Sequence, residues 1–250
     1  MDISILIPAY NEAKRLPVTL EKIFKHLANG FQGQFEVVVA NDGSNDNTAA
    51  VVNALAEKYS QLRLLDYKEN RGRGAVCQAA VLKVEGKYIL ISDADGSTDE
   101  KFITPFFEYL ETHHDVSMLV GSRDIEGAQI LTPQPKFRIL LNKIFLVMAK
   151  MLFGWPMHDR VNGFKMIRQV VARDIYSHQT ETSFFAEAEL IFIADSRGWK
   201  VKELPIEWTD DRDSKVKPVR EAINSFVGMF KIFIRGKRGV YKDQLKANIS

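Results

Sequence analysis

Cysteine is almost absent from this chain, and its scarcity restricts what the chain can build. The only thiol, Cys77, excludes an internal disulfide bond and any zinc site made of several cysteines. A single cysteine fits a reducing compartment. Because Cys77 lies in a helical pattern between Val76 and Gln78, we expect it to be a small core residue rather than a nucleophile.

Net charge is equally scarce. The chain has 34 Lys and Arg residues against 32 Asp and Glu residues, which gives a formal charge of +2 at pH 7. Proteins that bind nucleic acids need many unopposed Lys and Arg residues for phosphate contacts. A nucleic-acid partner held by a general basic field is therefore excluded, and any important positive charge has to be local.

Long apolar runs are missing as well. A transmembrane helix needs roughly 20 mostly apolar residues, whereas no stretch without Asp, Glu, Lys or Arg exceeds ten residues. The chain enters an apolar run at Ile3 with no basic leader before it, so we expect no cleaved secretory signal. The sequence predicts an intracellular protein that can attach to a membrane surface without crossing it.

What is present has the proportions of a folded protein of one or two domains, with 46% hydrophobic and 26% charged residues over 250 positions. Runs rich in branched residues predict strands at 3–8, 35–40, 62–67, 87–92 and 116–121. Helical patterns between and after them lie at 16–27, 48–59, 75–84 and 102–110. Apolar strands separated by helices predict an α/β fold with a parallel sheet covered on both faces.

Acidic and turn-forming residues gather where these strands end, and ligands of such sheets bind beyond the carboxyl ends of the strands. Asp93 and Asp95 follow a buried strand and lie two residues apart. They can direct both carboxylates at one hard cation that also holds a diphosphate. The polar residues at 44–46 have an equally good explanation as turn and helix-capping residues.

The second half of the chain carries two unusually apolar helices. Residues 137–153 are apolar around most of a helix, which indicates either burial in the protein or a place in a bilayer interface, and burial is favoured by composition alone. A helix is predicted at 184–198 and a strand at 201–208. The last helix follows Pro218 and combines an apolar stripe with basic residues, so it either packs on the sheet or meets an anionic membrane surface.

Seven motifs occur in an order that resembles one family. They are IPAYNE (7–12), NDGSNDNT (41–48), NRGRGAV (70–76), SDADG (92–96), GSR (121–123), HDRVNGFK (158–165) and EAE (187–189). Together they resemble family 2 glycosyltransferases, and among these the transferases that use polyprenyl phosphates, especially dolichyl-phosphate glucosyltransferases. The resemblance runs from about residue 2 to 235.

The resemblance implies a GT-A fold, an α/β Rossmann-like and mostly parallel sheet flanked by helices, with amphipathic helices at its C-terminal end. It divides the chain into a transferase domain at 1–217 and a basic helix and tail at 218–250. Within the domain, residues 1–122 would bind the nucleotide and residues 123–217 the acceptor.

The resemblance also implies residue roles on the donor side. Nucleotide-sugar contacts are expected from Pro8, Tyr10, Glu12, Asp42, Arg71, Asp93, Ala94, Arg212 and Lys215. The last two would close over the donor from a loop. Mg²⁺ or Mn²⁺ would be held by Asp93, Asp95 and Ser97. In the NRGRG turn, Arg71 or Arg73 adds positive charge beside glycines that permit close approach to phosphate.

On the acceptor side, Arg123, Arg138 and Asn142 would face a phosphate. A lipid phosphate has its second pKa near ~6 and arrives largely ionised, so it does not require a general base. A hydroxyl acceptor would need one, and the candidates are Asp159, Glu187 and Glu189. Because residues i and i+2 of a helix point in nearly opposite directions, only one of the two glutamates is expected in the site. We assign Asp95, Asp159 and Glu189 to catalysis.

The preferred function is therefore an inverting transfer of a hexose, preferably glucose from UDP-glucose, to a polyprenyl phosphate at the cytoplasmic face of a membrane. The alternatives are a GDP-mannose donor, a hydroxyl acceptor on a glycan or protein, and a binding protein without turnover. Two departures from the family pattern bear on these choices. Asn41 stands where an Asp is usual, and Val161-Asn162 replaces the usual residues before Gly163.

Overall fold

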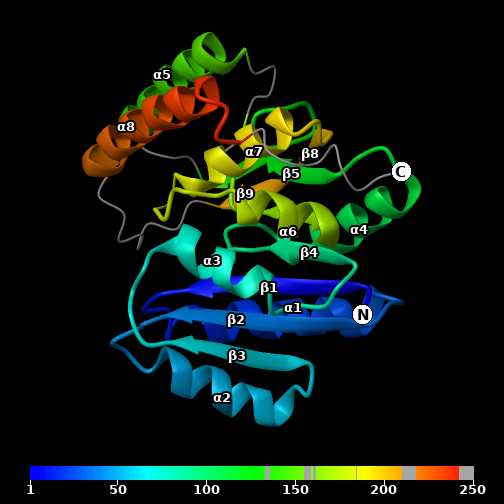
Figure 1. Cartoon of the computed structure of the whole chain (residues 1–250). Helices are drawn as coiled ribbons and strands as arrows, with labels where there is room; N and C mark the ends of the chain where they lie inside the picture. The colour runs from blue at the N-terminus through cyan, green and yellow to red at the C-terminus, as the bar shows by residue number, and fades with distance from the viewer. Residues whose placement is uncertain (133–135, 155–158, 160–161, 184, 210–217, 242–250) are drawn as a thin grey trace.

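The computed structural model describes residues 1–132, 136–154, 159, 162–183, 185–209 and 218–241. The main strands are β1 (Ile3–Ala9), β2 (Phe35–Asp42), β3 (Leu62–Tyr67), β4 (Tyr88–Ile91), β5 (Met118–Ser122), β7 (Lys165–Arg168) and β8 (Val201–Pro205). Within the described residues they form one sheet in the order β3-β2-β1-β4-β7-β5-β8 (Figure 1). All neighbours in this sheet run parallel except β7, which is antiparallel to both β4 and β5.

Helices cover both faces of this sheet because its strands are apolar on both sides. One face packs on α1 (Leu16–Gly30), α2 (Thr48–Lys58) and α4 (Ile103–Thr112), which follows the short 3-10 helix η1 (Glu100–Phe102). The other face packs on α3 (Arg73–Val81), α6 (Gln169–Ser177) and α7 (Ala186–Ser196). Successive strand residues alternate between the two cores; Ile5 and Ile7 lie in the first, and Leu6 in the second.

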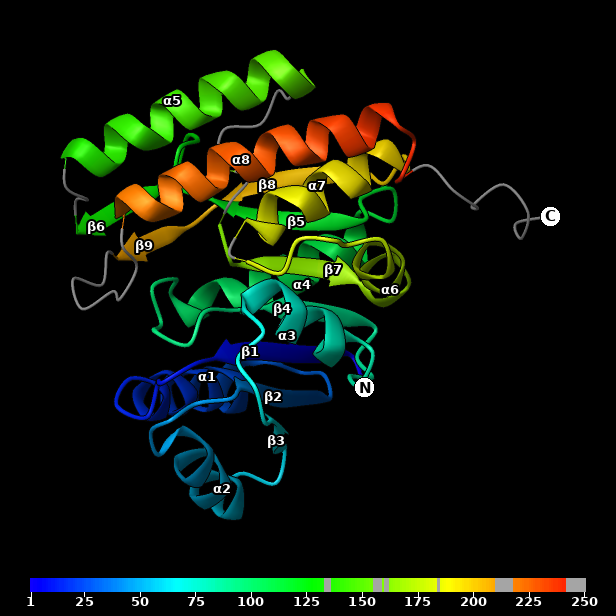
Figure 2. The same cartoon turned by 60° about the vertical axis from the view of Figure 1, so that its left-hand side comes forward.

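Two long helices, α5 (Lys136–Phe153) and α8 (Pro218–Lys237), lie together beyond α7 (Figure 2). Met229 and Ile232 of α8 are fully buried and join the core on the α7 side. The rings of Phe153 and Phe233 connect α5 to α8, with centroids 6.1 Å apart. The C-terminal helix therefore packs on the body of the protein along one of its faces.

A second apolar face of these helices remains exposed. On α5 the exposed apolar residues are Ile139, Ile144, Val147 and Met151, and on α8 they are Val227, Phe230 and Ile234. Composition alone favoured burial for 137–153, but among its described side chains only Ala149 is fully buried. The difference arises because α5 lies on the far side of α8 from α7, at the edge of the described part of the protein (Figure 2). Within the described residues, no helix has both the length and the apolar character needed to cross a membrane.

The sequence predicted most of these elements but missed the short elements η1 and β6 (Gln129–Thr132) and two others. The strands of the first half and the helices at 16–27, 48–59, 75–84 and 102–110 are confirmed within a few residues. Strand β7 and helix α6 were not predicted. The strand expected at 201–208 divides at Ile206 into β8 and β9 (Glu207–Thr209). Ile206 donates to Ser122 of β5 and accepts from Gln129, so the chain passes from the main sheet to a small one formed by β9 and β6 (Gln129–Thr132).

The antiparallel strand β7 brings its starting end to the carboxyl edge of its parallel neighbours. Lys165 pairs with Ile91 of β4 on one side and with Val120 of β5 on the other. Continuing this register by two residues places Gly163 between Asp93 and Ser122. The segment before β7 thus separates the acidic turn after β4 from the end of β5.

Candidate active site

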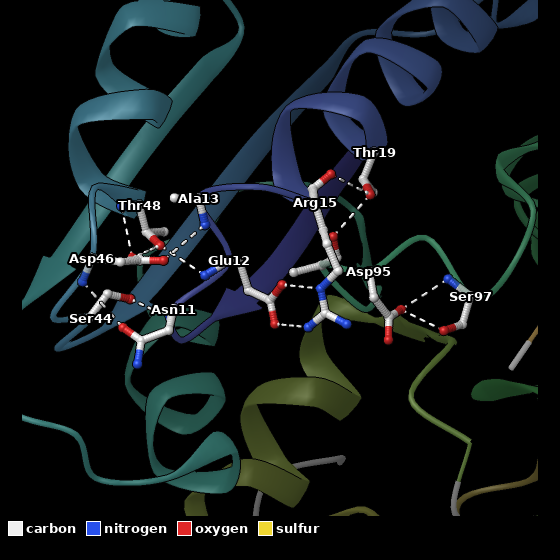
Figure 3. A network of polar contacts seen from close by, with 11 residues as sticks. Asn11, Glu12, Ala13, Arg15, Thr19, Ser44, Asp46, Thr48, Asp95 and Ser97 are labelled. Carbon is white, nitrogen blue, oxygen red and sulfur yellow. Dashed lines mark hydrogen bonds and ion pairs between the residues drawn. The ribbon is translucent and has the colours of Figure 1, made fainter. Parts of the chain in front are cut away.

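The loops that follow β1 and β2 are fastened to each other at the carboxyl edge of the sheet (Figure 3). Asn11 has a positive φ of 57°, and its Oδ1 accepts the backbone N–H groups of Asn45 and Asp46 at 2.8 and 3.3 Å. The Ser44 hydroxyl accepts the N–H of Asn11 at 2.9 Å. These contacts fix the two predicted nucleotide-binding loops relative to each other.

The predicted contacts of the IPAYNE motif occupy different environments. Pro8 is buried inside β1, whereas Tyr10 is 40% exposed and leaves its ring open to stacking. Glu12 forms an ion pair with Arg15, with Glu12 Oε2 2.7 Å from Arg15 Nε. Figure 3 shows this pair between the Asn11 contacts and Asp95. Glu12 therefore orients the guanidinium of Arg15 near Asp95, a role that the sequence had not suggested.

Asp42 holds the NRGRG turn. Its carboxylate oxygens accept the backbone N–H groups of Arg71 and Gly72, both at 2.9 Å. Gly72 has a φ of +92°, and a Cβ there would lie 2.6 Å from the Thr182 carbonyl oxygen. Glycine is required because this backbone conformation and this close approach both disfavour a side chain. The Arg71 side chain lies near Glu69, with a shortest separation of 3.7 Å.

The unusual Asn41 has a physical explanation. Its Nδ2 donates to Asp66 Oδ1 at 2.7 Å, and its Oδ1 accepts from Ser44. An aspartate at this buried position would place a second carboxylate against Asp66. The amide is thus matched to its neighbour in β3.

A largely apolar cavity of about 370 Å³ opens beside Asp42 and Arg71 and continues along α3 past Tyr67 and Ala75. A second cavity of about 360 Å³ adjoins Asp95 and is lined by basic residues from the start of α1, namely Lys14, Arg15 and Lys22. Both cavities meet the edge of the sheet where the polar turns gather. One cavity is thus mostly apolar and lies beside the loop held by Asp42, and the other brings three basic side chains near Asp95.

The acidic turn after β4 brings the three predicted metal ligands together but uses them differently. Asp95 Oδ1 accepts the N–H and hydroxyl of Ser97 at 2.9 and 2.6 Å, and no described group donates to its Oδ2. The Ala94 carbonyl accepts from the Thr19 hydroxyl at 2.9 Å. Asp93 Oδ1 lies 2.9 Å from Arg73 Nη2 in an ion pair. Asp95 is thus the carboxylate with an oxygen left for a ligand.

Four charged residues form a continuous chain from this turn into the protein, which we call the charge chain: Asp93, whose side chain is 27% exposed, Arg73, Glu187 and Lys165. Arg73 Nε donates to Glu187 Oε1 at 3.0 Å, and Lys165 Nζ donates to Glu187 Oε2 at 2.5 Å. Burial raises the pKa of Glu187, but Lys165 and Arg73 outweigh it, so the net pKa lies below its ordinary value. Burial, Asp95 and Glu187 raise the pKa of Asp93 against the opposing charge of Arg73.

Arg123 and Asp159, both predicted site residues, form a close pair on the other side of β7. Arg123 donates to Asp159 Oδ2 from Nε at 2.6 Å and from its backbone at 3.0 Å, and to Oδ1 from Nη2 at 2.9 Å. The guanidinium lies 4.9 Å from the Trp208 ring centroid. Although burial lowers the pKa of Arg123, Asp159 raises it further. Arg123 is therefore a fixed cation, and both oxygens of Asp159 are occupied.

Glu189, which was assigned to catalysis from the sequence, has both carboxylate oxygens engaged by neighbouring groups. Glu189 is fully buried and accepts from Thr180, Glu181 and Tyr241, with the Tyr241 hydroxyl 2.7 Å from Oε1. Tyr241 follows the end of α8, and Thr180 and Glu181 precede α7. As expected for residues i and i+2, the two glutamates diverge, and Glu187 is the one that lies beside the acidic turn.

Four predicted residues fall outside what the structure describes. Nothing is described for Arg212 and Lys215, and the side chains of Arg138 and Asn142 also lie outside the described set. Sequence reasoning assigned no role to Lys165 or Trp208. Lys165 is the first residue of β7 and is fully buried, so it requires an anionic partner, but this could not be read from the sequence because β7 itself was not predicted.

Two further predictions concern metals and thiols. Among the described residues, no group of three or more His, Cys, Asp or Glu side chains is arranged to hold a metal ion. Burial raises the pKa of the Cys77 thiol to about 12, so it stays protonated. Cys77 is 1% exposed and belongs to the core, as its sequence context predicted.

The arrangement of sheet and helices defines a class of protein. It matches a crystal structure of glucosyl-3-phosphoglycerate synthase from Mycobacterium tuberculosis in complex with Mn²⁺, UDP-glucose and phosphoglyceric acid, with a TM-score of 0.66. The match covers 93% of this chain and 79% of the synthase at 14% identity. The protein therefore has the GT-A glycosyltransferase fold, as the motifs implied.

The sequence places the chain within that class. The model of glycosyl transferase family 2 matches residues 4–176, and the chain belongs to this family. A dolichyl-phosphate beta-glucosyltransferase of Trichomonas vaginalis is 33% identical over 253 residues, covering 98% of this chain and 74% of the relative. Proteins of the same name from Dictyostelium discoideum and Homo sapiens are 28% and 27% identical, covering 96% and 86% of this chain and 76% and 70% of those proteins.

Proposed function

We propose that this glycosyltransferase moves glucose from UDP-glucose to the phosphate of dolichol or a related polyprenol. The observation that carries the acceptor class is the state of the three candidate bases. Asp159, Glu187 and Glu189 each have both carboxylate oxygens engaged by other groups. An alcohol acceptor needs a free base, whereas a phosphate is already an oxyanion. The names of the relatives support the same acceptor and sugar.

On the donor side, Tyr10 and the loop held by Asp42 would receive the nucleoside, beside the apolar cavity. Asp95 Oδ2 would hold Mg²⁺ or Mn²⁺. A cation of this kind is commonly bound by one or two carboxylates plus substrate phosphates, so the available oxygen fits it. When bound, the ion neutralises charge that develops on the leaving diphosphate. A fold relative crystallised with Mn²⁺ and UDP-glucose supports this proposal.

On the acceptor side, Arg123 would orient the lipid phosphate. Its guanidinium is held by Asp159 and Trp208, so little entropy is lost when it binds an anion. Register places it across the segment at Gly163 from Asp93. An attacking phosphate oxygen could thus approach the anomeric carbon opposite the leaving diphosphate. Such a single displacement inverts the anomeric centre and gives a β-linked product from an α-linked donor.

We further propose that α5 and α8 rest on the cytoplasmic face of a membrane. Their exposed apolar side chains, including Val147, Met151 and Phe230, are accompanied by the exposed lysines Lys143, Lys150 and Lys231. An apolar face with flanking basic residues favours an anionic lipid surface. In this scheme residues 1–217 form the transferase domain, and the helix at 218–237 supplies membrane contact in addition to its packing.

The test combines transfer and binding. The purified protein is incubated with UDP-glucose, UDP-galactose or GDP-mannose, with Mg²⁺ or Mn²⁺, and with a short polyprenyl phosphate or the corresponding alcohol. Glucosylated lipid phosphate from UDP-glucose is the expected product. Product from GDP-mannose instead of UDP-glucose would contradict the proposed donor. Product with the alcohol alone would contradict the proposed acceptor. Tight nucleotide binding without any product would indicate a binding protein. Flotation with anionic vesicles should weaken when Val147 and Phe230 are replaced by Asp.

A further inference from the structure

Glu187 lies at the centre of the charge chain, and each of its carboxylate oxygens accepts from a cation. It is 2% exposed, and its two oxygens are taken by Arg73 and Lys165. A carboxylate held between two cations is a poor general base because both favour its ionised form, in agreement with its lowered pKa. Any effect of Glu187 on the reaction is therefore expected to act through the two cations that it holds, Arg73 and Lys165.

Arg73 and Lys165, the two neighbours of Glu187, each contact a different part of the site. Arg73 Nη2 pairs with Asp93, in the acidic turn of the donor side, at 2.9 Å. Lys165 Nζ donates to the backbone carbonyl of Asn162, in the segment before β7 that follows Asp159. The chain of contacts thus runs from the donor carboxylate to the segment beside the acceptor pair.

The charges of this chain balance, since two carboxylates face two cations. Lys165 and Glu187 are 0% and 3% exposed at their side chains, and Arg73 is 14% exposed. At such burial an ion pair whose partner is removed leaves an uncompensated charge. The ion pair between Asp93 and Arg73 fits only because residue 163 is a glycine. A Cβ at Gly163 would lie 2.5 Å from Asp93 Oδ2 and 2.7 Å from Arg73 Nη2.

We propose that Glu187 is a positioning residue that sets the separation between the donor carboxylate Asp93 and the acceptor-side segment at Asn162, through Arg73 and Lys165. The inference rests on the proposed function for the identity of the two substrates. Loss of this tie would let the donor diphosphate and the acceptor phosphate shift relative to each other. Because the nucleoside is held by other loops, its binding would change little.

The principal variant is Glu187→Gln, which keeps the shape but leaves two buried cations facing one carboxylate. We expect kcat to fall on the order of 100-fold, the effect of a misplacement of about 1 Å at a reacting centre. The dissociation constant for UDP, measured by titration calorimetry, should change less than about threefold, because the nucleoside is held by other loops. A tenfold change would correspond to about 1.4 kcal/mol of binding free energy. Glu187→Asp should fail similarly because a shorter side chain cannot reach both cations.

A double-mutant cycle separates positioning from a general structural role. If Glu187 acts through Arg73 on Asp93, the Asp93→Asn and Glu187→Gln effects on kcat/KM should overlap, so that the double variant is at most about threefold worse than Asp93→Asn alone. Effects that multiply would overturn the proposal, as would a Glu187→Gln enzyme within twofold of the wild-type kcat.

Glu36→Gln is the matched control. Glu36 is also buried and accepts from Ser4 and Arg63, but it lies at the opposite end of the strands from the site. It should lower the unfolding temperature without changing kcat. If Glu187→Gln does not fold, Arg73→Lys replaces it, because lysine keeps the charge but not the two directed contacts. If the lipid phosphate is the wrong acceptor, wild-type protein gives no product with it, and the same cycle is then read from kcat/KM with the alcohol acceptor, so that the proposed function and the positioning role fail separately.

Discussion

Replacing Gly163 with alanine is the sharpest perturbation that the structure offers. A Cβ at this position would lie 2.5 and 2.6 Å from the Asp93 carboxylate oxygens and 2.7 Å from Arg73 Nη2. Ordinary contact begins at 3.4 Å, so the ion pair must retreat. A retreat of roughly 1 Å predicts a loss on the order of 100-fold in kcat/KM for the donor. Overpacking a tight position should also cost about 1–3 kcal/mol of stability.

The assay is the initial rate of glucosyl transfer at varied donor and fixed acceptor, with urea unfolding measured on the same preparations. Gly30→Ala is the control, because a Cβ at Gly30 has no neighbour within 4 Å. It should leave the rate unchanged. A folded Gly163→Ala protein with a kcat/KM within twofold of wild type would refute the argument that Asp93 and Arg73 have to occupy their observed positions.

Three further predictions follow from other contacts. Arg123→Lys removes the two-pronged contact with Asp159 and should raise the KM for the lipid phosphate about tenfold or more, with the donor KM unchanged, as read from initial rates. Tyr241→Phe leaves buried Glu189 short of one donor and should cost about 1–3 kcal/mol in urea unfolding without lowering kcat; unchanged stability would contradict this. Burial raises the pKa of Glu36, but hydrogen bonds from Ser4, Glu85 and Arg63 outweigh it, so the folded pKa is lowered. Its stabilisation is therefore present above the unfolded pKa of about 4.3 and lost as the pH falls through the folded value, so the stability gap between wild type and Glu36→Gln should close in acid.

Local patterns were sufficient for the first half of the fold because its strands are long, apolar and separated by clear helices. β7 escaped prediction because it has only four residues, two of them charged, and its pairing depends on distant strands. The exposure of α5 also could not be read from composition. An apolar helix looks the same whether it is covered or not, and its place outside α8 is a tertiary property.

In the site, too, local sequence patterns predicted some features, whereas others depend on tertiary contacts. The turns after β1, β2 and β4 follow from strand ends and motifs, and the structure gathers them at one edge. Which of Glu187 and Glu189 faces that edge depends on the rotation of α7, which two buried partners decide: Lys165 for the first and Tyr241 for the second. Partnerships between groups distant in sequence, such as Arg123 with Asp159, likewise required the folded chain.

The insertion of β7 between β4 and β5 has a consequence for the order in which the molecule can assemble. As the chain is synthesised, β5 emerges well before β7, yet among the described strands its neighbours in the main sheet are β7 and β8. Until residue 168 is available, the edge of β4 stays open and β5 has no strand to join. An open edge invites mispairing. A fragment ending at Ser122 should therefore aggregate, and the segments before and after residue 122 are expected to fold together rather than one after the other.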